Sequence, residues 1–351
     1  MDIFNLPISE RIDWLMEHAR THSASYSSPE SSMARTRYLA EHPTDLVVLK
    51  CMDGRVNISV ATNTPQGIIN PLRNLGGYFN LGWPHMSEVL SNHLRGVIAE
   101  GRRSMIIISY HYSKGSPERG CAGFNYDIEA AKAHTLELKK QVEQVFGPGH
   151  SIVYPMVCGF ETDEDALILH GSNGDKLDVS TLGPSDQGSL LPRLEKLFPD
   201  MSAQMRLDLL PLVEGNIEHI EKGRDQTRQL DNVHREWTIC VGHVYDFLQI
   251  PNLALIIGPY SPSLEEPIHK AAGIIQDNME TGRIPDDGFL LLTSAPYRDA
   301  GLEMERAKLN SRFLSDFAAK QIRLSHPQLA KKMHMRTAVM NWQTRDLSLL
   351  D

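Results

Sequence analysis

The sequence lacks any apolar run long enough to cross a bilayer, and its N-terminus lacks the basic start and apolar core of a signal peptide. It has no excess of positive charge either: 35 Lys and Arg face 44 Asp and Glu, a formal net charge of -9, which disfavours general nucleic-acid binding. Four cysteines in 351 residues are too few for a disulfide framework. We therefore expect a cytoplasmic protein with no nucleic-acid or membrane partner, acting on a small molecule or a protein.

The apolar segments predict an α/β fold. The runs 46–50 and 105–109 are typical of buried strands, and the apolar positions of 86–100 recur at helical spacing. A strand, a helix and a second strand in this order predict a parallel pair whose C-terminal ends lie at one edge of the sheet.

Polar side chains stand where both strands end. Cys51, Asp53 and Arg55 follow the first strand at alternate positions. Because alternate side chains of an extended segment share a face, we expect all three to point into one cleft. His111 ends the second strand, so the parallel pairing would bring it near Cys51.

Other segments fill in the predicted organisation. We expect a helix over 8–20, a polar loop over 21–32, a short helix over 35–41, a tight turn at Gly76-Gly77, a loop over 112–120, a helix over 127–146, a strand over 151–158 with a hairpin partner at 166–170, and mainly helix over 191–229.

The C-terminal part looks like a degenerate repeat of the first strands. Segment 253–258 resembles the first strand and 288–297 the second, with Gly258 and Ala295 where the first copy has Cys and His. A helix is predicted over 302–322. We therefore expect an N-terminal helical segment (1–37), a metal-binding catalytic domain (38–230) and a degenerate second domain (231–351).

Two thiolates and one imidazole, from Cys51, Cys121 and His111, form a ligand set that suits zinc. Three protein ligands leave one position open, where a bound water can become a nucleophile. Asp53 would accept a hydrogen bond from that water or occupy the position itself, and Arg55 would hold Asp53 ionised and oriented. His111 as an ordinary core histidine, Asp53 with Arg55 as a structural ion pair, and Cys51 as a nucleophile are alternatives that the residues leave open.

The segment 51–55, Cys-Met-Asp-Gly-Arg, resembles the Cys-x-Asp-x-Arg motif of β-class carbonic anhydrases. Segments 39–41 and 73–77 resemble the flanking parts of that class. The class commonly has His-x-x-Cys as its second ligand pair, whereas nine residues separate His111 from Cys121 here. A wider spacing resembles the carboxysome shell carbonic anhydrases, a divergent branch. Segments 162–170, 214–218 and 295–301 are compatible with this branch.

The resemblance implies a β-carbonic-anhydrase-like, mostly parallel sheet flanked by helices, with a second copy of the fold that has lost the ligands. It implies zinc held by Cys51, His111 and Cys121, with Asp53 and Arg55 as catalytic residues in the hydration of carbon dioxide to bicarbonate by a zinc-bound hydroxide. The branch uses an N-terminal extension for carboxysome attachment, and this chain has about forty residues before its first strand. We expect a homo-oligomer, either free in the cytoplasm or in contact with a carboxysome shell or Rubisco.

Two other functions remain open at this point. A non-catalytic scaffold subunit would keep the ligands and the fold, and would bind zinc without turnover. A zinc hydrolase of a related small molecule, such as carbon disulfide or carbonyl sulfide, would use the same ligands with a different pocket.

Overall fold

The computed structural model describes residues 2–147, 152–225 and 233–350. It divides the chain into two compact units. Unit 1 comprises Met1–Ala34, Met52–Arg55 and Val233–Asp351, and unit 2 comprises Arg35–Cys51 and Val56–Asn232. The chain therefore leaves unit 2 after Cys51 for four residues only. The predicted division at 37/38 and 230/231 stays a prediction, and residues 230 and 231 lie outside the described ranges.

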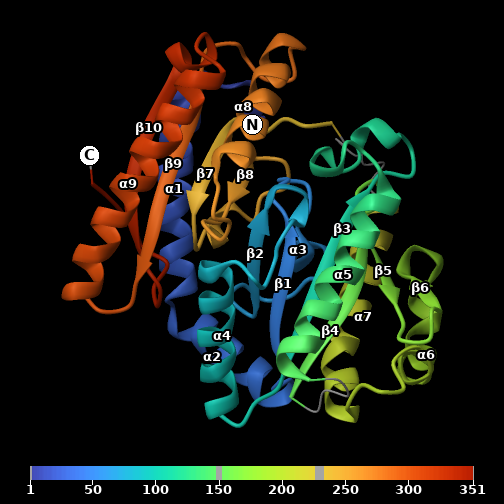
Figure 1. Cartoon of the computed structure of the whole chain (residues 1–351). Coiled ribbons are helices and arrows are strands. Elements are labelled where there is room, and N and C mark those ends of the chain that lie inside the picture. The colour runs from blue at the N-terminus through green and yellow to red at the C-terminus, as the bar shows by residue number, and fades with distance from the viewer. Residues whose placement is uncertain (1, 148–151, 226–232, 351) are drawn as a thin grey trace. The chain divides into compact units, whose positions relative to one another are not determined.

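The sheet of unit 2 has six strands in the order β2-β1-β3-β4-β5-β6 (Figure 1). The strands are β1 (Asp45–Cys51), β2 (Ile69–Asn74), β3 (Ser104–Tyr112), β4 (Val153–Glu161), β5 (Ala166–His170) and β6 (Lys176–Asp178). β1 pairs in parallel with both β2 and β3, and β3 pairs in parallel with β4. The remaining pairs, β4 with β5 and β5 with β6, are antiparallel. The predicted mostly parallel sheet and the hairpin at 166–170 are confirmed, although residue 151 lies outside the described ranges.

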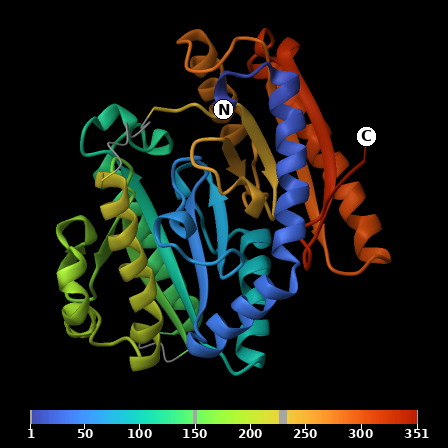
Figure 2. The same ribbon diagram turned by 180° about the vertical axis from the view of Figure 1, so that it is seen from behind.

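Helices flank this sheet on both faces. They are α3 (Ile58–Ala61), α4 (Pro84–Ala99), α5 (Ile128–Phe146), α6 (Leu190–Leu197) and α7 (Ala203–Asp225). α5 covers one face and α7 the other (Figures 1 and 2). The Asp127 carboxylate caps α5 by accepting the Ala130 N–H at 3.0 Å, and an apolar stripe including Leu138 and Val142 faces the core. The α/β class is thus confirmed. The predicted helical stretch to 229 ends outside the described residues.

Unit 1 holds a second, five-stranded sheet in the order β11-β10-β9-β7-β8. Its strands are β7 (Thr238–Gly242), β8 (Ala254–Ile257), β9 (Phe289–Tyr297), β10 (Met333–Asn341) and β11 (Leu347–Leu349). α8 (Glu265–Glu280) and α9 (Leu302–Ser325) pack on one face, and α1 (Ile8–Tyr26) lies on the other (Figures 1 and 2). No helix among the described residues is long and apolar enough to span a membrane.

The second copy of the strand arrangement is present, but the sequence matched the wrong C-terminal strand to the first strand of the chain. β7 lies between β8 and β9 and is parallel to both, as β1 lies between β2 and β3. The counterpart of the first strand is therefore β7, and segment 253–258 contains β8, the counterpart of β2. The five buried residues of β7 formed too short a run to stand out in the sequence.

The predicted polar loop over 21–32 was also wrong. α1 continues to Tyr26, and α2 (Pro29–Glu41) begins three residues later. His22 and Tyr26 extend the buried stripe of α1 by about two helical turns beyond Ala19, and the Ser23 hydroxyl donates to the Thr344 carbonyl at 2.9 Å. Tertiary packing thus outweighs the weak helix propensity of this serine-rich stretch.

Candidate metal centre and charged network

Two parallel strands of unit 2 deliver the first two predicted ligands. Leu49 of β1 stands beside Ile108 of β3 in the register, so both strands run toward the same edge and Cys51 and His111 come near it. Cys121 follows on the loop after β3. The sulfur and ring nitrogen atoms of these three residues all lie within 4.8 Å of one another, and all three residues are buried. The structure brings the predicted ligands together, and their binding of a metal stays a prediction.

The donor set fits a zinc ion. Zinc binds sulfur and nitrogen at about 2.0 to 2.3 Å, so one ion can reach donor atoms this closely spaced. Burial raises the pKa of the Cys51 thiol well above its usual value, and the neighbouring Cys121 raises it further. A cation among the three donors would reverse this effect by stabilising the thiolates. The site therefore has the composition and burial that a thiolate-rich zinc centre needs.

Two acidic residues at the end of β4 hold the loop between His111 and Cys121. The buried Glu161 carboxylate accepts backbone N–H groups from Lys114 at 2.9 Å, Asp163 at 3.0 Å and Glu164 at 3.0 Å. Asp163 in turn accepts the Ser113 hydroxyl at 2.8 Å and the Gly115 N–H at 2.6 Å. These bonds hold the loop between His111 and Cys121 in one conformation.

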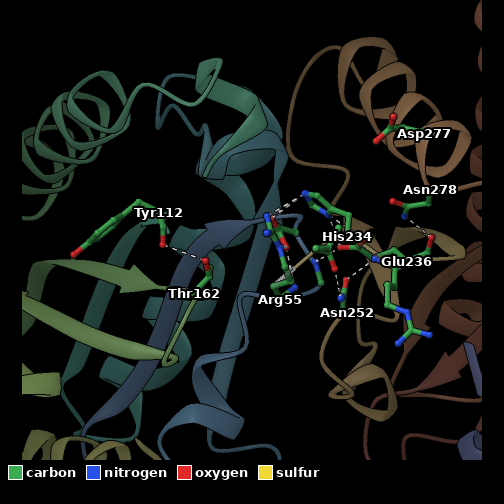
Figure 3. A network of polar contacts seen from close by, with 12 residues as sticks. Arg55, Tyr112, Thr162, His234, Glu236, Asn252, Asp277 and Asn278 are labelled. Carbon is green, nitrogen blue, oxygen red and sulfur yellow. Dashed lines mark hydrogen bonds and ion pairs between the residues drawn. The ribbon is translucent and has the colours of Figure 1, made fainter. Parts of the chain in front are cut away.

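The backbone around Thr162 supports the same loop. Thr162 donates to the Tyr112 carbonyl through its N–H at 2.9 Å and its hydroxyl at 3.2 Å (Figure 3). Burial raises the pKa of Glu161, and this effect is larger than the lowering caused by the backbone N–H groups that donate to its carboxylate. We call Glu161, Thr162 and Asp163 the loop clasp.

The glycine turn after β2 packs on the same region. Gly76 and Gly77 have φ of +65° and +67°, which glycine adopts without strain. A side chain at Gly77 would stand 3.3 Å from the Lys50 carbonyl carbon, and one at Gly123 would stand 2.6 Å from Gly76. The predicted tight turn is confirmed, and it lies against the backbone of β1 and of the loop that carries Cys121.

Asp53 and Arg55 do not continue the extended strand, contrary to the prediction. β1 ends at Cys51, and residues 52–55 form a bend and a turn that belong to unit 1. Their backbone runs beside β8: the Asn252 N–H donates to the Gly54 carbonyl at 2.9 Å and the Ile256 N–H to the Met52 carbonyl at 3.0 Å.

Within this turn, Arg55 and Asp53 form a buried bidentate ion pair. The Arg55 Nε donates to Asp53 Oδ1 at 3.0 Å, and Nη2 donates to Oδ2 at 2.6 Å. The Arg55 backbone N–H adds a third bond to Oδ1 at 2.8 Å. Such a fork fixes the carboxylate in orientation as well as in charge. The predicted pairing of these two side chains is confirmed, and their catalytic role stays a prediction.

A histidine and a glutamate extend the ion pair into a network (Figure 3). The His234 Nε2 lies 3.0 Å from Arg55 Nη2, and its Nδ1 lies 2.9 Å from Glu236 Oε2. Glu236 is fully buried and also accepts the Gly54 N–H at 3.2 Å. We call Asp53, Arg55, His234 and Glu236 the charged network.

Sequence reasoning missed His234 and Glu236. They precede β7 by a few residues but lie about 180 positions from Asp53 in the chain, and no local spacing links the two segments. The feature that could have revealed them is a histidine lying between two carboxylates. This arrangement forms only when the chain folds, so the sequence does not display it. Asp53, His234 and Glu236 also offer donor atoms within 4.8 Å of one another. The positive Arg55 guanidinium already pairs with the Asp53 carboxylate of this group.

The remaining cysteines belong to neither cluster. Cys158 is buried in β4 and Cys240 in β7. Burial raises the pKa of Cys158 to about 12, so it stays a neutral thiol in the core. A free cysteine in such a position packs as a small apolar side chain.

Comparison with known proteins identifies one related family. Residues 83–180 match the model of the carboxysome shell carbonic anhydrase catalytic domain. This is the family that the sequence resembles, so the resemblance is confirmed over this stretch. His111, Cys121 and the loop clasp lie inside the matched residues, whereas Cys51 and the charged network lie outside them. No curated protein matches the chain.

Proposed function

We propose that this protein is a zinc-dependent carbonic anhydrase that interconverts carbon dioxide and bicarbonate. The observation that carries the proposal is the buried Cys51, His111 and Cys121 cluster, with donor atoms within 4.8 Å of one another. The match of residues 83–180 to a carbonic anhydrase catalytic domain supports the same activity. By the same match we propose association with a carboxysome, and by sequence reasoning a homo-oligomeric state.

In the proposed reaction, Cys51, His111 and Cys121 would hold a zinc ion. Zinc, when bound, would supply a nucleophile by making a bound water acidic near neutral pH. Asp53 follows Cys51 by two residues in the chain, and we assign to its carboxylate the hydrogen bond that directs a lone pair of the nucleophile at carbon dioxide. Arg55 keeps Asp53 in place through its fork and offsets its negative charge.

The proposal predicts the effect of removing one ligand. Cys51→Ala should lose the zinc and carbon dioxide hydration together, with a rate loss of at least about a thousandfold, because metal activation of the nucleophile disappears. Cys158→Ala is the matched control, since it removes a buried thiol of the same unit that lies outside the cluster. It should keep one zinc per chain and full activity.

The same measurement separates the other functions. Zinc bound at one per chain without hydration at any pH would favour the scaffold subunit. Zinc with turnover of carbon disulfide or carbonyl sulfide but not of carbon dioxide would favour the related hydrolase. Zinc retained by Cys51→Ala would refute the ligand assignment itself.

A further inference from the structure

We infer that His234 and Glu236, which the C-terminal part of the chain contributes, are positioning residues for the Asp53 and Arg55 pair. The inference rests on the proposed function, because it assigns these residues to the same reaction. Three observations within unit 1 carry it: the contacts of His234, the burial of Glu236 and the anchoring of the backbone on both sides.

The contacts fix the tautomer of His234. The Glu236 carboxylate can only accept a hydrogen bond, so Nδ1 of His234 must donate to it at 2.9 Å. Arginine can only donate, so Nε2 of His234 must accept from Arg55 Nη2 at 3.0 Å. His234 therefore carries its proton on Nδ1 and presents a lone pair to the guanidinium. The arrangement follows the rule that an orienting carboxylate selects the tautomer of a functional histidine.

This lone pair completes the hold on Arg55. Nη2 is the same nitrogen that donates to Asp53 Oδ2 at 2.6 Å, so His234 and Asp53 share one amino group of the guanidinium. Because Nη2 is bonded on both sides, the guanidinium cannot rotate freely. Fixing a long arginine side chain costs conformational entropy, and the two bonds offset this cost. The orientation of the Asp53 carboxylate thus depends on His234 through Arg55.

Glu236 holds the turn as well as the histidine. Its Oε1 accepts the Gly54 N–H at 3.2 Å, and the Asn278 side chain donates to its backbone carbonyl at 3.0 Å (Figure 3). A side chain at Gly54 would stand 2.7 Å from the Ala254 carbonyl oxygen and 3.1 Å from the Glu236 side chain. Gly54 is therefore required for the close approach of the turn to Glu236 and β8.

The sharpest test replaces Glu236 with its neutral isostere. In Glu236→Gln the amide can donate to Nδ1, which favours the opposite tautomer and points an N–H of His234 at the N–H of Arg55. We expect kcat to fall about ten- to a hundredfold, with KM nearly unchanged and one zinc per chain retained. His234→Ala should show the same loss.

A conservative variant separates positioning from other roles. The amide oxygen of His234→Gln can still accept from Arg55, so this variant should recover most of the activity that His234→Ala loses. His269→Ala removes a half-buried histidine of α8 that bonds to Gln321 instead, and it should behave as wild type. If His234→Ala keeps kcat within twofold of wild type, or if His234→Gln is as slow as His234→Ala, the positioning role is wrong.

A spectroscopic readout keeps this test independent of the reaction. Nitrogen-15 NMR of histidine-labelled protein should show His234 with its proton on Nδ1 in the wild type and on Nε2 in Glu236→Gln. A wild-type proton on Nε2 would overturn the inference whatever the activity. A wild-type protein without hydration activity but with the expected tautomer would refute the proposed function while leaving the contacts intact. Should His234→Ala fail to fold, Glu236→Gln and His234→Gln decide the question.

Discussion

The three predicted metal ligands of unit 2 are two thiols and an imidazole, whereas the charged network of unit 1 contains a guanidinium and two carboxylates. Burial raises the pKa of the Cys51 thiol, which disfavours its thiolate until a cation supplies the compensating charge. In the charged network, Arg55 pairs with Asp53 in a 2.6 Å contact, and the protein itself supplies the opposite charge. The ligand cluster therefore lacks a built-in cation, whereas the charged network contains its own.

The largest expected difference is the cost of truncation in zinc-free protein. Arg55→Ala leaves the buried Asp53 carboxylate without its cation and should cost about 3 to 5 kcal/mol of unfolding free energy. Cys121→Ala removes a small buried side chain and should cost about 1 kcal/mol. Chemical denaturation of both zinc-free variants measures the two values. Equal costs would contradict the distinction between the clusters.

Acid should weaken both units through one histidine in each, the buried His22 and the half-buried His170. Burial lowers the pKa of His22 in unit 1 and of His170 in unit 2 to about 4, from an ordinary 6.5. The unfolded chain binds these protons more readily, so stability is complete above pH 6.5 and falls as the pH drops toward 4. The loss is at most about 3 kcal/mol for His22, and smaller for His170, which is less buried.

Substitution of either histidine tests this origin. Unfolding free energies at pH 7 and pH 4.5 should converge in His22→Phe, because the replacement has no proton to bind and keeps a ring near Tyr26 and Phe247. His170→Gln should flatten the profile less. A pH dependence identical to wild type in His22→Phe would show that other groups control it.

The smallest predicted effect concerns the loop clasp. Asp163→Asn loses one acceptor for the Ser113 hydroxyl or the Gly115 N–H, so the loop before Cys121 should hold its ligand less firmly. We expect zinc to dissociate about tenfold faster. Asp186→Asn is the control, since Asp186 accepts the Gly183 N–H elsewhere in unit 2. Equal dissociation rates of zinc in the two variants would show that the loop clasp does not affect zinc binding.

The sequence was sufficient to predict the parts of the site that local patterns encode. The apolar runs ending at Cys51 and His111 predicted parallel strands with ligands at one edge, and the register of β1 and β3 agrees. The turn that carries Asp53 and Arg55 was predicted as an extended segment, because the pattern could not reveal that Met52 pairs with Ile256 of β8 and Gly54 with Asn252.

Long-range contacts account for the rest of what was missed. His234 and Glu236 reach Arg55 and Gly54 only in the folded unit, and the last turns of α1 are helical because His22 and Tyr26 are buried. The loop clasp joins Glu161 to a loop some 47 residues earlier. None of these contacts has a signature in local spacing or composition, since each depends on which surfaces the tertiary structure brings together.

A zinc titration of metal-free wild-type protein, with carbon dioxide hydration measured at each step, tests whether the cysteine and histidine cluster holds the catalytic ion. If Cys51, His111 and Cys121 hold the catalytic ion, hydration should rise in proportion to added zinc and stop rising at one equivalent per chain. Full activity before zinc is added, or no activity with one equivalent bound, would contradict this assignment of the ligands.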